Sequence, residues 1–130
     1  MTKLLQSELQ KFQAKFYSFG DALVKSVNFN YEKNEFRVEI EAQDSTCVPP
    51  RWRYITLTME DCFSMKTIHG NAAYGVLSLG LYILFEKESV GLEFGNFGDT
   101  PESMEELMTS PFHVVGKFLY WQVNNEGDDA

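Results

Sequence analysis

The sequence of 130 residues is poor in the side chains that build metal and redox sites. It contains two cysteines, Cys47 and Cys62, and two histidines, His69 and His113. The cysteines form neither a CxxC pair nor a disulfide framework, and no His/Cys spacing matches a zinc site. The sequence therefore predicts two free thiols, no metal site and no cofactor.

Long hydrophobic runs are also missing. The longest, VLSLGLYILF at residues 76–85, is interrupted by Ser78 and Gly80, whereas a membrane-spanning helix needs about 20 apolar residues. The first residues, MTKLLQSELQKF, lack the apolar segment and the cleavage site of a signal peptide. We therefore expect a cytoplasmic protein that does not bind a membrane.

Basic residues are scarce in the second half of the chain. Residues 1–66 hold nine Lys or Arg and nine Asp or Glu, so their charges balance. Residues 67–130 hold two bases, Lys87 and Lys117, against ten acids, so the whole formal net charge of −8 arises there. Such a charge repels nucleic acid and anionic lipid and attracts a basic protein. We therefore expect a protein partner and no binding to nucleic acid.

The excess of acid is concentrated in KESVGLEFGNFGDTPESMEELM, residues 87–108. Ordered carboxylates steer a basic partner, and aromatic side chains among them supply buried anchors. Phe97 is the better anchor, because Phe94 continues the alternation of a buried strand. A solubilising surface without a binding role is the alternative. The candidate partner-binding residues are Glu93, Phe97, Asp99, Glu102, Glu105 and Glu106.

Helices are expected in two segments. Four apolar residues at spacings of four, three and four predict an amphipathic helix from about residue 3 to about residue 17. The sequence TPE at residues 100–102 is a helix start, and Pro111 ends this short helix before Ser110. The apolar stripe of the first helix consists of Leu5, Leu9, Phe12 and Phe16.

Strand periodicity dominates the rest of the chain. Alternating apolar and polar residues predict a β-hairpin at residues 22–42, a strand at 52–59 and a second hairpin at 77–94. FHVVGKFLYWQV, residues 112–123, is apolar on both faces, which predicts a central strand. We expect an α+β fold in which the N-terminal helix packs on a curved, half-barrel-like meander of mainly antiparallel strands. Residues 1–130 form a single domain in this prediction, with residues 124–130 as a frayed acidic tail.

Enzyme motifs are not found. GVLSLG, residues 75–80, is one residue too long for a nucleophile elbow, and HGNAAYG, residues 69–75, lacks the lysine of a phosphate-binding loop. His113 lies in an apolar strand, where a packed histidine is the expected role. We therefore expect no enzymatic activity. Because loops carry binding sites, a secondary candidate is the loop with His69, Asn71 and Tyr74.

YSFGDALVKSVNFNYEKNEFRVEIEA, residues 17–42, resembles the opening of small bacterial immunity-type proteins, in which an aromatic–x–Phe–His–Asp–(Ala/Ser) segment leads into a hairpin. Phe19, Asp21 and Ala22 match this pattern, and Gly20 replaces its histidine. The later order of strands is similar as far as residue 123. The resemblance implies a cytoplasmic antidote to a contact-delivered or polymorphic toxin, as in contact-dependent growth inhibition, that binds and blocks one toxin domain.

Three hypotheses of function follow. The first is an immunity protein whose acidic surface blocks a basic toxin domain, with a nuclease as the expected toxin. The second is a small-molecule-binding or enzymatic domain that uses the concave face of the sheet. The third is an acidic adaptor subunit of a larger assembly. In the second hypothesis the wall residues are Trp52, Tyr54, His69 and Tyr74.

Overall fold

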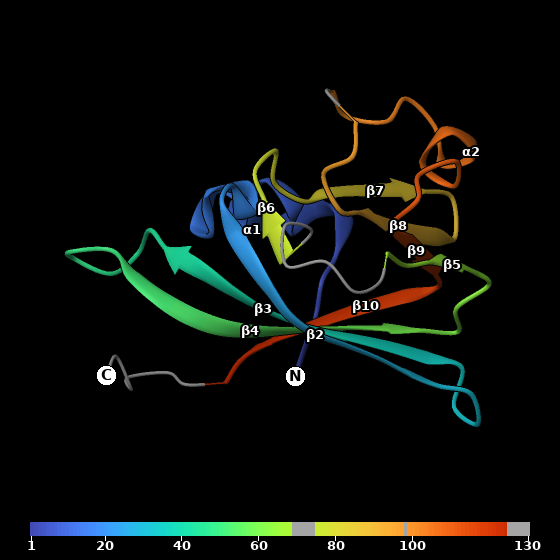
Figure 1. Cartoon of the computed structure of the whole chain (residues 1–130), viewed down its shortest axis with the longest axis horizontal. Helices are drawn as coiled ribbons and strands as arrows, with labels where there is room; N and C mark the ends of the chain where they lie inside the picture. Colours follow the sequence, from blue (N-terminus) through green and yellow to red (C-terminus); the bar gives the residue numbers. More distant parts are fainter. Residues whose placement is uncertain (69–74, 98, 125–130) are drawn as a thin grey trace.

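The computed structural model describes residues 1–68, 75–97 and 99–124 (Figure 1). These residues form an α+β fold with antiparallel strands in two sheets and two short α-helices, which confirms the predicted fold class. No helix among them is long and apolar enough to cross a membrane. Of the predicted tail, only Asn124 belongs to the described residues.

The two sheets differ in size. The larger has the strand order β1-β10-β4-β3-β2-β6, and the smaller has the order β5-β9-β8-β7. The strands of the larger sheet are β1 (Thr2–Lys3), β2 (Ala22–Asn30), β3 (Glu35–Asp44), β4 (Arg51–Glu60), β6 (Val76–Leu77) and β10 (Phe118–Val123). Those of the smaller sheet are β5 (Ser64–Lys66), β7 (Tyr82–Glu86), β8 (Ser89–Glu93) and β9 (His113–Gly116). The helices are α1 (Leu9–Lys15) and α2 (Met104–Leu107), and the 3-10 turns are η1 (Gln6–Glu8) and η2 (Tyr17–Phe19).

Strands β3 and β4, each ten residues long, form the centre of the larger sheet. They pair antiparallel over nine residues each, from Phe36 opposite Met59 to Asp44 opposite Arg51. Because side chains alternate between the two faces of a strand, one face of this pair is apolar and the other is polar. The predicted first hairpin and third strand are confirmed. The buried residues of β3 are Phe36, Val38, Ile40, Ala42 and Asp44.

Two different layers cover the apolar face of the larger sheet. Figure 1 shows α1 and the smaller sheet on the same side of the long strands. Below α1 the contacts are aromatic, with the rings of Phe12 and Phe16 5.5 Å apart. Below the smaller sheet, Phe94 stacks on Phe112 at 4.1 Å and lies 6.3 Å from Phe36. All of these side chains belong to one continuous hydrophobic core.

The first helix is shorter than the predicted 3–17. The α-helical part is only Leu9–Lys15, because the preceding residues pair with the edge of β10 instead. Lys3 lies opposite Tyr120, and the amide of Leu4 donates to the carbonyl of Leu119 at 2.8 Å. Phe12 and Phe16 are buried as predicted, whereas Leu5 is 49% exposed.

Two predicted strands are each divided by a turn. The run at residues 77–85 breaks at Gly80, where φ is +84° and an added Cβ would lie 2.5 Å from the Ser18 carbonyl oxygen. The final strand breaks at Lys117, whose amide donates to the Glu60 carbonyl at 3.0 Å. The two parts of the final strand, β9 and β10, therefore belong to different sheets. The prediction of a single meander sheet is wrong, and the described strands do not close into a barrel.

The outer edge of β2 has little cover. Within the described residues, β6 pairs with β2 only at Ala22 and Leu23. The pairing of β2 with β3 shifts register between Val24 and Ser26, which marks a β-bulge. No other described strand pairs with the outer edge of β2 from Val24 to Asn30.

Phe12→Ala tests the core below α1. The ring of Phe12 lies 5.2 Å from that of Trp121 and 5.7 Å from that of Phe19, so its removal leaves a cavity between α1 and the larger sheet. We expect urea denaturation to show a loss of about 3–5 kcal/mol in the free energy of unfolding. The control Leu5→Ala, on the same segment, should change it by about 0.5 kcal/mol or less. Equal losses in the two variants would contradict this assignment of the core.

Candidate functional site

Helix α2 and the loop before it carry most of the predicted partner-binding residues. Asp99, Glu102, Glu105 and Glu106 are all exposed, and we call these four residues the acidic surface. Helix α2 packs on the face of the smaller sheet that points away from the core. Its buried residues Met104 and Leu107 form a separate small cluster with Val115 and Leu84.

The packing of α2 on the smaller sheet depends on Gly91, which has no side chain. A Cβ added to Gly91 of β8 would lie 2.7 Å from the sulfur of Met104 and 3.0 Å from a methyl carbon of Leu107. Helix α2 therefore lies directly on the backbone of β8. This contact sets which face of the helix is buried, so that Glu105 and Glu106 point to solvent.

Side chains also hold the start of α2. The hydroxyl of Ser103 accepts a hydrogen bond from the Glu106 amide at 3.0 Å, which is an N-cap. A carboxylate oxygen of Glu106 accepts from the Glu102 amide at 3.0 Å, and one of Glu86 accepts from the Met104 amide at 3.2 Å. Carboxylates at this end of a helix also interact favourably with its dipole. Glu106 therefore stabilises the segment as well as contributing charge.

The acidic surface has no internal counter-charge. Across residues 1–68, 75–97 and 99–124, no Lys or Arg forms an ion pair with any of its four carboxylates. In the first half of the chain, by contrast, Glu41 pairs with Lys25 at 3.8 Å and Glu35 with Arg37 at 3.3 Å. The ion pairs seen among the described residues thus all involve carboxylates of the first half of the chain.

Glu93 does not belong to the acidic surface. Its exposed fraction is 0%, because β8 lies between β7 and β9 and the loop that follows β8 folds over this side chain. Its carboxylate accepts hydrogen bonds from the Asn96 amide at 2.9 Å and from the Ser110 hydroxyl at 2.7 Å. The sequence prediction that Glu93 presents a surface carboxylate is corrected: its bonds tie the loop after β8 to the segment that precedes β9. Phe94 is buried as predicted, and Phe97 is partly buried.

His113 has both ring nitrogens occupied. Nδ1 lies 2.7 Å from the Ser110 carbonyl oxygen, and Nε2 lies 2.9 Å from the Ser64 hydroxyl. Because a carbonyl only accepts, Nδ1 carries the proton and Nε2 accepts from Ser64. His113 is thus a packed histidine that joins β9 to β5. The secondary candidates His69, Asn71 and Tyr74 lie outside the described residues.

Sequence reasoning missed a charge cluster around the buried Asp44. A carboxylate oxygen of Asp44 lies 3.3 Å from Lys15 Nζ and 3.3 Å from Arg53 Nε, and the other accepts from the Thr46 hydroxyl at 2.6 Å. Burial acts to raise the pKa of Asp44, but the hydrogen bonds from Thr46 and the Lys15 ammonium outweigh it and hold the pKa below its ordinary value. The cluster joins α1 to the end of the β3–β4 hairpin.

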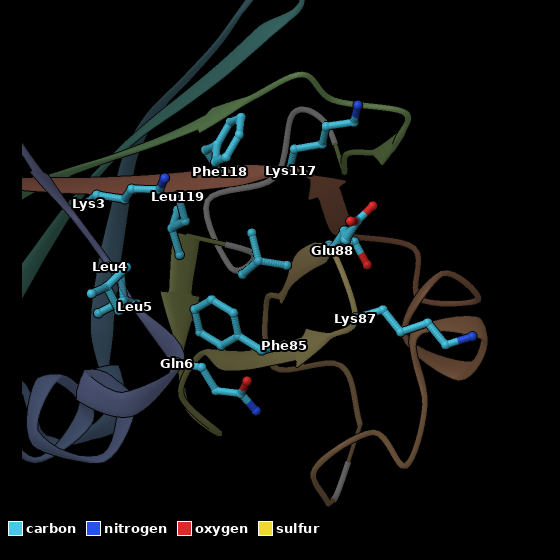
Figure 2. A pocket seen from close by; sticks show the side chains of 12 residues that line it. Lys3, Leu4, Leu5, Gln6, Phe85, Lys87, Glu88, Lys117, Phe118 and Leu119 are labelled. Carbon is cyan, nitrogen blue, oxygen red and sulfur yellow. The ribbon is translucent and has the colours of Figure 1, made fainter.

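The structure also has a hollow that the sequence did not indicate. Figure 2 shows it between the N-terminal segment, β10 and the turn that joins β7 to β8. Its volume is about 450 Å³. Apolar side chains form its walls and lysines lie along its rim, so we call it the lysine-rimmed hollow. The main wall residues are Leu4, Leu5, Phe85, Val90, Phe118 and Leu119, and the lysines are Lys3, Lys87 and Lys117.

Comparisons with protein-family models, with curated proteins and with solved structures find no significant match for this chain. Its function is therefore inferred from its own residues.

Asp44→Asn tests the charge cluster through its pH dependence. The pKa of Asp44 is lowered on folding, so the ionised carboxylate stabilises the protein above about pH 4, and this contribution is lost as the pH falls through the lowered value. At pH 7 we expect Asp44→Asn to reduce the free energy of unfolding by about 1.5–3 kcal/mol. The difference from the unmodified protein should shrink towards pH 3. As a control, Glu41→Gln removes a more exposed ion pair and should cost less than about 1 kcal/mol.

The two thiols should differ in reactivity. Burial raises the pKa of Cys62 from 9.0 to about 11, and its thiol donates to the Met59 carbonyl at 3.3 Å. At pH 8 only on the order of one thousandth of Cys62 is thiolate, which is the reactive form. Iodoacetamide should therefore label the partly exposed Cys47 first, and label both residues only in urea. Equal labelling of the native protein, measured by peptide mass spectrometry, would contradict this expectation.

Proposed function

We propose that this protein is an immunity-type antidote that binds a basic toxin domain through its acidic surface and blocks it. The observation that carries the proposal is that the carboxylates of this surface have no basic partner among the described residues, whereas several acids of the first half are paired. The expected toxin is a nuclease, and the expected place of action is the cytoplasm.

The charge of the acidic surface suits such a partner. A nuclease needs a basic surface to hold phosphates, and an inhibitor with ordered carboxylates competes for that surface. Complementary charge also raises the rate of association, which is useful when the antidote must bind before the toxin acts. Inhibition then comes from occupying the substrate site and requires no catalytic residue.

The support beneath the acidic surface favours tight binding. Helix α2 is held by its contact with Gly91 and by the Ser103 cap, so the surface is ordered before a partner arrives. Pre-ordering lowers the entropy that is lost on binding. Phe97 lies in the same loop and is partly buried, so part of its ring is available as an anchor.

Charge reversal at two positions tests the proposal. Glu102→Lys with Glu105→Lys leaves the caps of Ser103 and Glu106 in place. The candidate toxin is the product of the gene adjacent to that of this protein. We expect the association of the double variant with it to slow by roughly tenfold or more at low salt. The effect should shrink at about 1 M salt, where charges more than about 3 Å apart are screened. Stopped-flow or biosensor kinetics at two salt concentrations measure this change.

The matched control is Glu8→Lys with Glu32→Lys, which makes the same change in net charge at exposed positions on other elements. It should associate almost as fast as the unmodified protein. Growth rescue of cells that express the toxin should fail with the first variant and succeed with the control. If the first variant folds, binds at an unchanged rate in low salt and rescues growth, the acidic surface is only solubilising and the proposal is wrong.

A further inference from the structure

We propose that the lysine-rimmed hollow is a second binding site, for an amphiphilic anion such as a medium-chain alkyl carboxylate. The hollow lies on other elements than the acidic surface and is independent of the toxin-binding proposal. Its volume of about 450 Å³ falls within the range of about 300–1,000 Å³ that is usual for small-molecule sites.

The walls of the hollow suit an apolar chain. Figure 2 shows Leu119 and Phe85 pointing toward the same space from β10 and β7. Leu4, Val90 and Leu119 are at most 3% exposed, so they close the base of the hollow. The apolar surface that remains open comes from residues with larger exposed fractions, chiefly Leu5, Phe85 and Phe118.

The rim of the hollow favours an anion. The Lys3 ammonium lies 4.3 Å from the centre of the Phe118 ring, and a cation in this position is attracted to the aromatic face. Lys117 is adjacent to Phe118 in the chain, while Lys87 points away from the hollow (Figure 2). None of the three lysines forms an ion pair with another described residue, although Glu88 also lines the hollow.

The distribution of charge strengthens this reading. Lys117, which lines the hollow, is one of only two bases in residues 67–130, against ten acids. Cations without a carboxylate partner beside open apolar surface are complementary to a ligand with an anionic head and an apolar tail. A cationic amphiphile of the same length lacks this complementarity, and a short carboxylate lacks the tail.

Titration with decanoate, below the concentration at which it forms micelles, tests the site. In two-dimensional ¹H–¹⁵N spectra we expect saturable shifts of the amides at residues 89–90 and 117–119. Decyltrimethylammonium, with the same tail and opposite charge, should bind at least about tenfold more weakly. Butyrate, with the same head and a short tail, should cause no saturable shift. Equal binding of the two ten-carbon amphiphiles, or decanoate shifts located elsewhere, would overturn the proposal.

Substitutions test separately whether the hollow recognises the anionic head and the apolar tail of decanoate. Lys3→Met with Lys117→Met should weaken decanoate binding at least about fivefold and reduce the discrimination against the cation. The matched control is Lys33→Met with Lys66→Met, which removes the same charge from exposed lysines away from the hollow and should bind normally. The contribution of the apolar wall is tested with Leu5→Ser, which should weaken decanoate binding. The variant should remain folded, because Leu5 is exposed. The control Leu79→Ser, at an exposed apolar residue away from the hollow, should bind decanoate normally. Unchanged binding in the double lysine variant would show that the head group is not recognised here.

Discussion

The length mismatch between the central strands and the first helix is the constraint on which the rest of the structure depends. Strands β3 and β4 have ten residues each and are about 33 Å long, whereas the seven residues of α1 span about 10 Å. One short helix therefore covers only one end of the apolar face. The smaller sheet has to cover the other end. The chain therefore leaves the larger sheet after β4, adds the two residues of β6 to its edge, and returns to pair with β4 only at β10.

Close approaches at glycine make this arrangement possible and connect it to the candidate site. At Gly116, just before the chain re-enters the larger sheet, an added Cβ would lie 2.6 Å from the Glu60 carbonyl oxygen. At Gly91 the missing side chain lets α2 lie on the outer face of the smaller sheet. The direction in which the acidic surface faces is thus a consequence of how the second layer is built. Strand β8 therefore contributes to the core and also positions the helix that carries the candidate site.

Local patterns predicted the fold class, the two hairpins and the buried Phe12 and Phe16, because alternation and helical spacing are properties of neighbouring residues. The division of the final strand at Lys117 was not predictable in this way, since its cause is a contact with Glu60 in a distant strand. The same holds for Asp44, whose partner Lys15 is 29 residues away. Glu93 was misplaced because a charged residue in a strand suggests exposure, whereas its partners Asn96 and Ser110 are supplied by the loop that covers it.

The edge of β2 has a consequence for behaviour at high concentration. An unpaired strand edge is a template on which another chain can add, and this is a common start of aggregation. Here the bulge between Val24 and Ser26 interrupts the regular spacing of backbone donors and acceptors, and the exposed Lys25 adds a charge beside it. Both features make edge-to-edge stacking of copies unfavourable. The bulge thus hinders the addition of another copy at an edge that no further described strand covers.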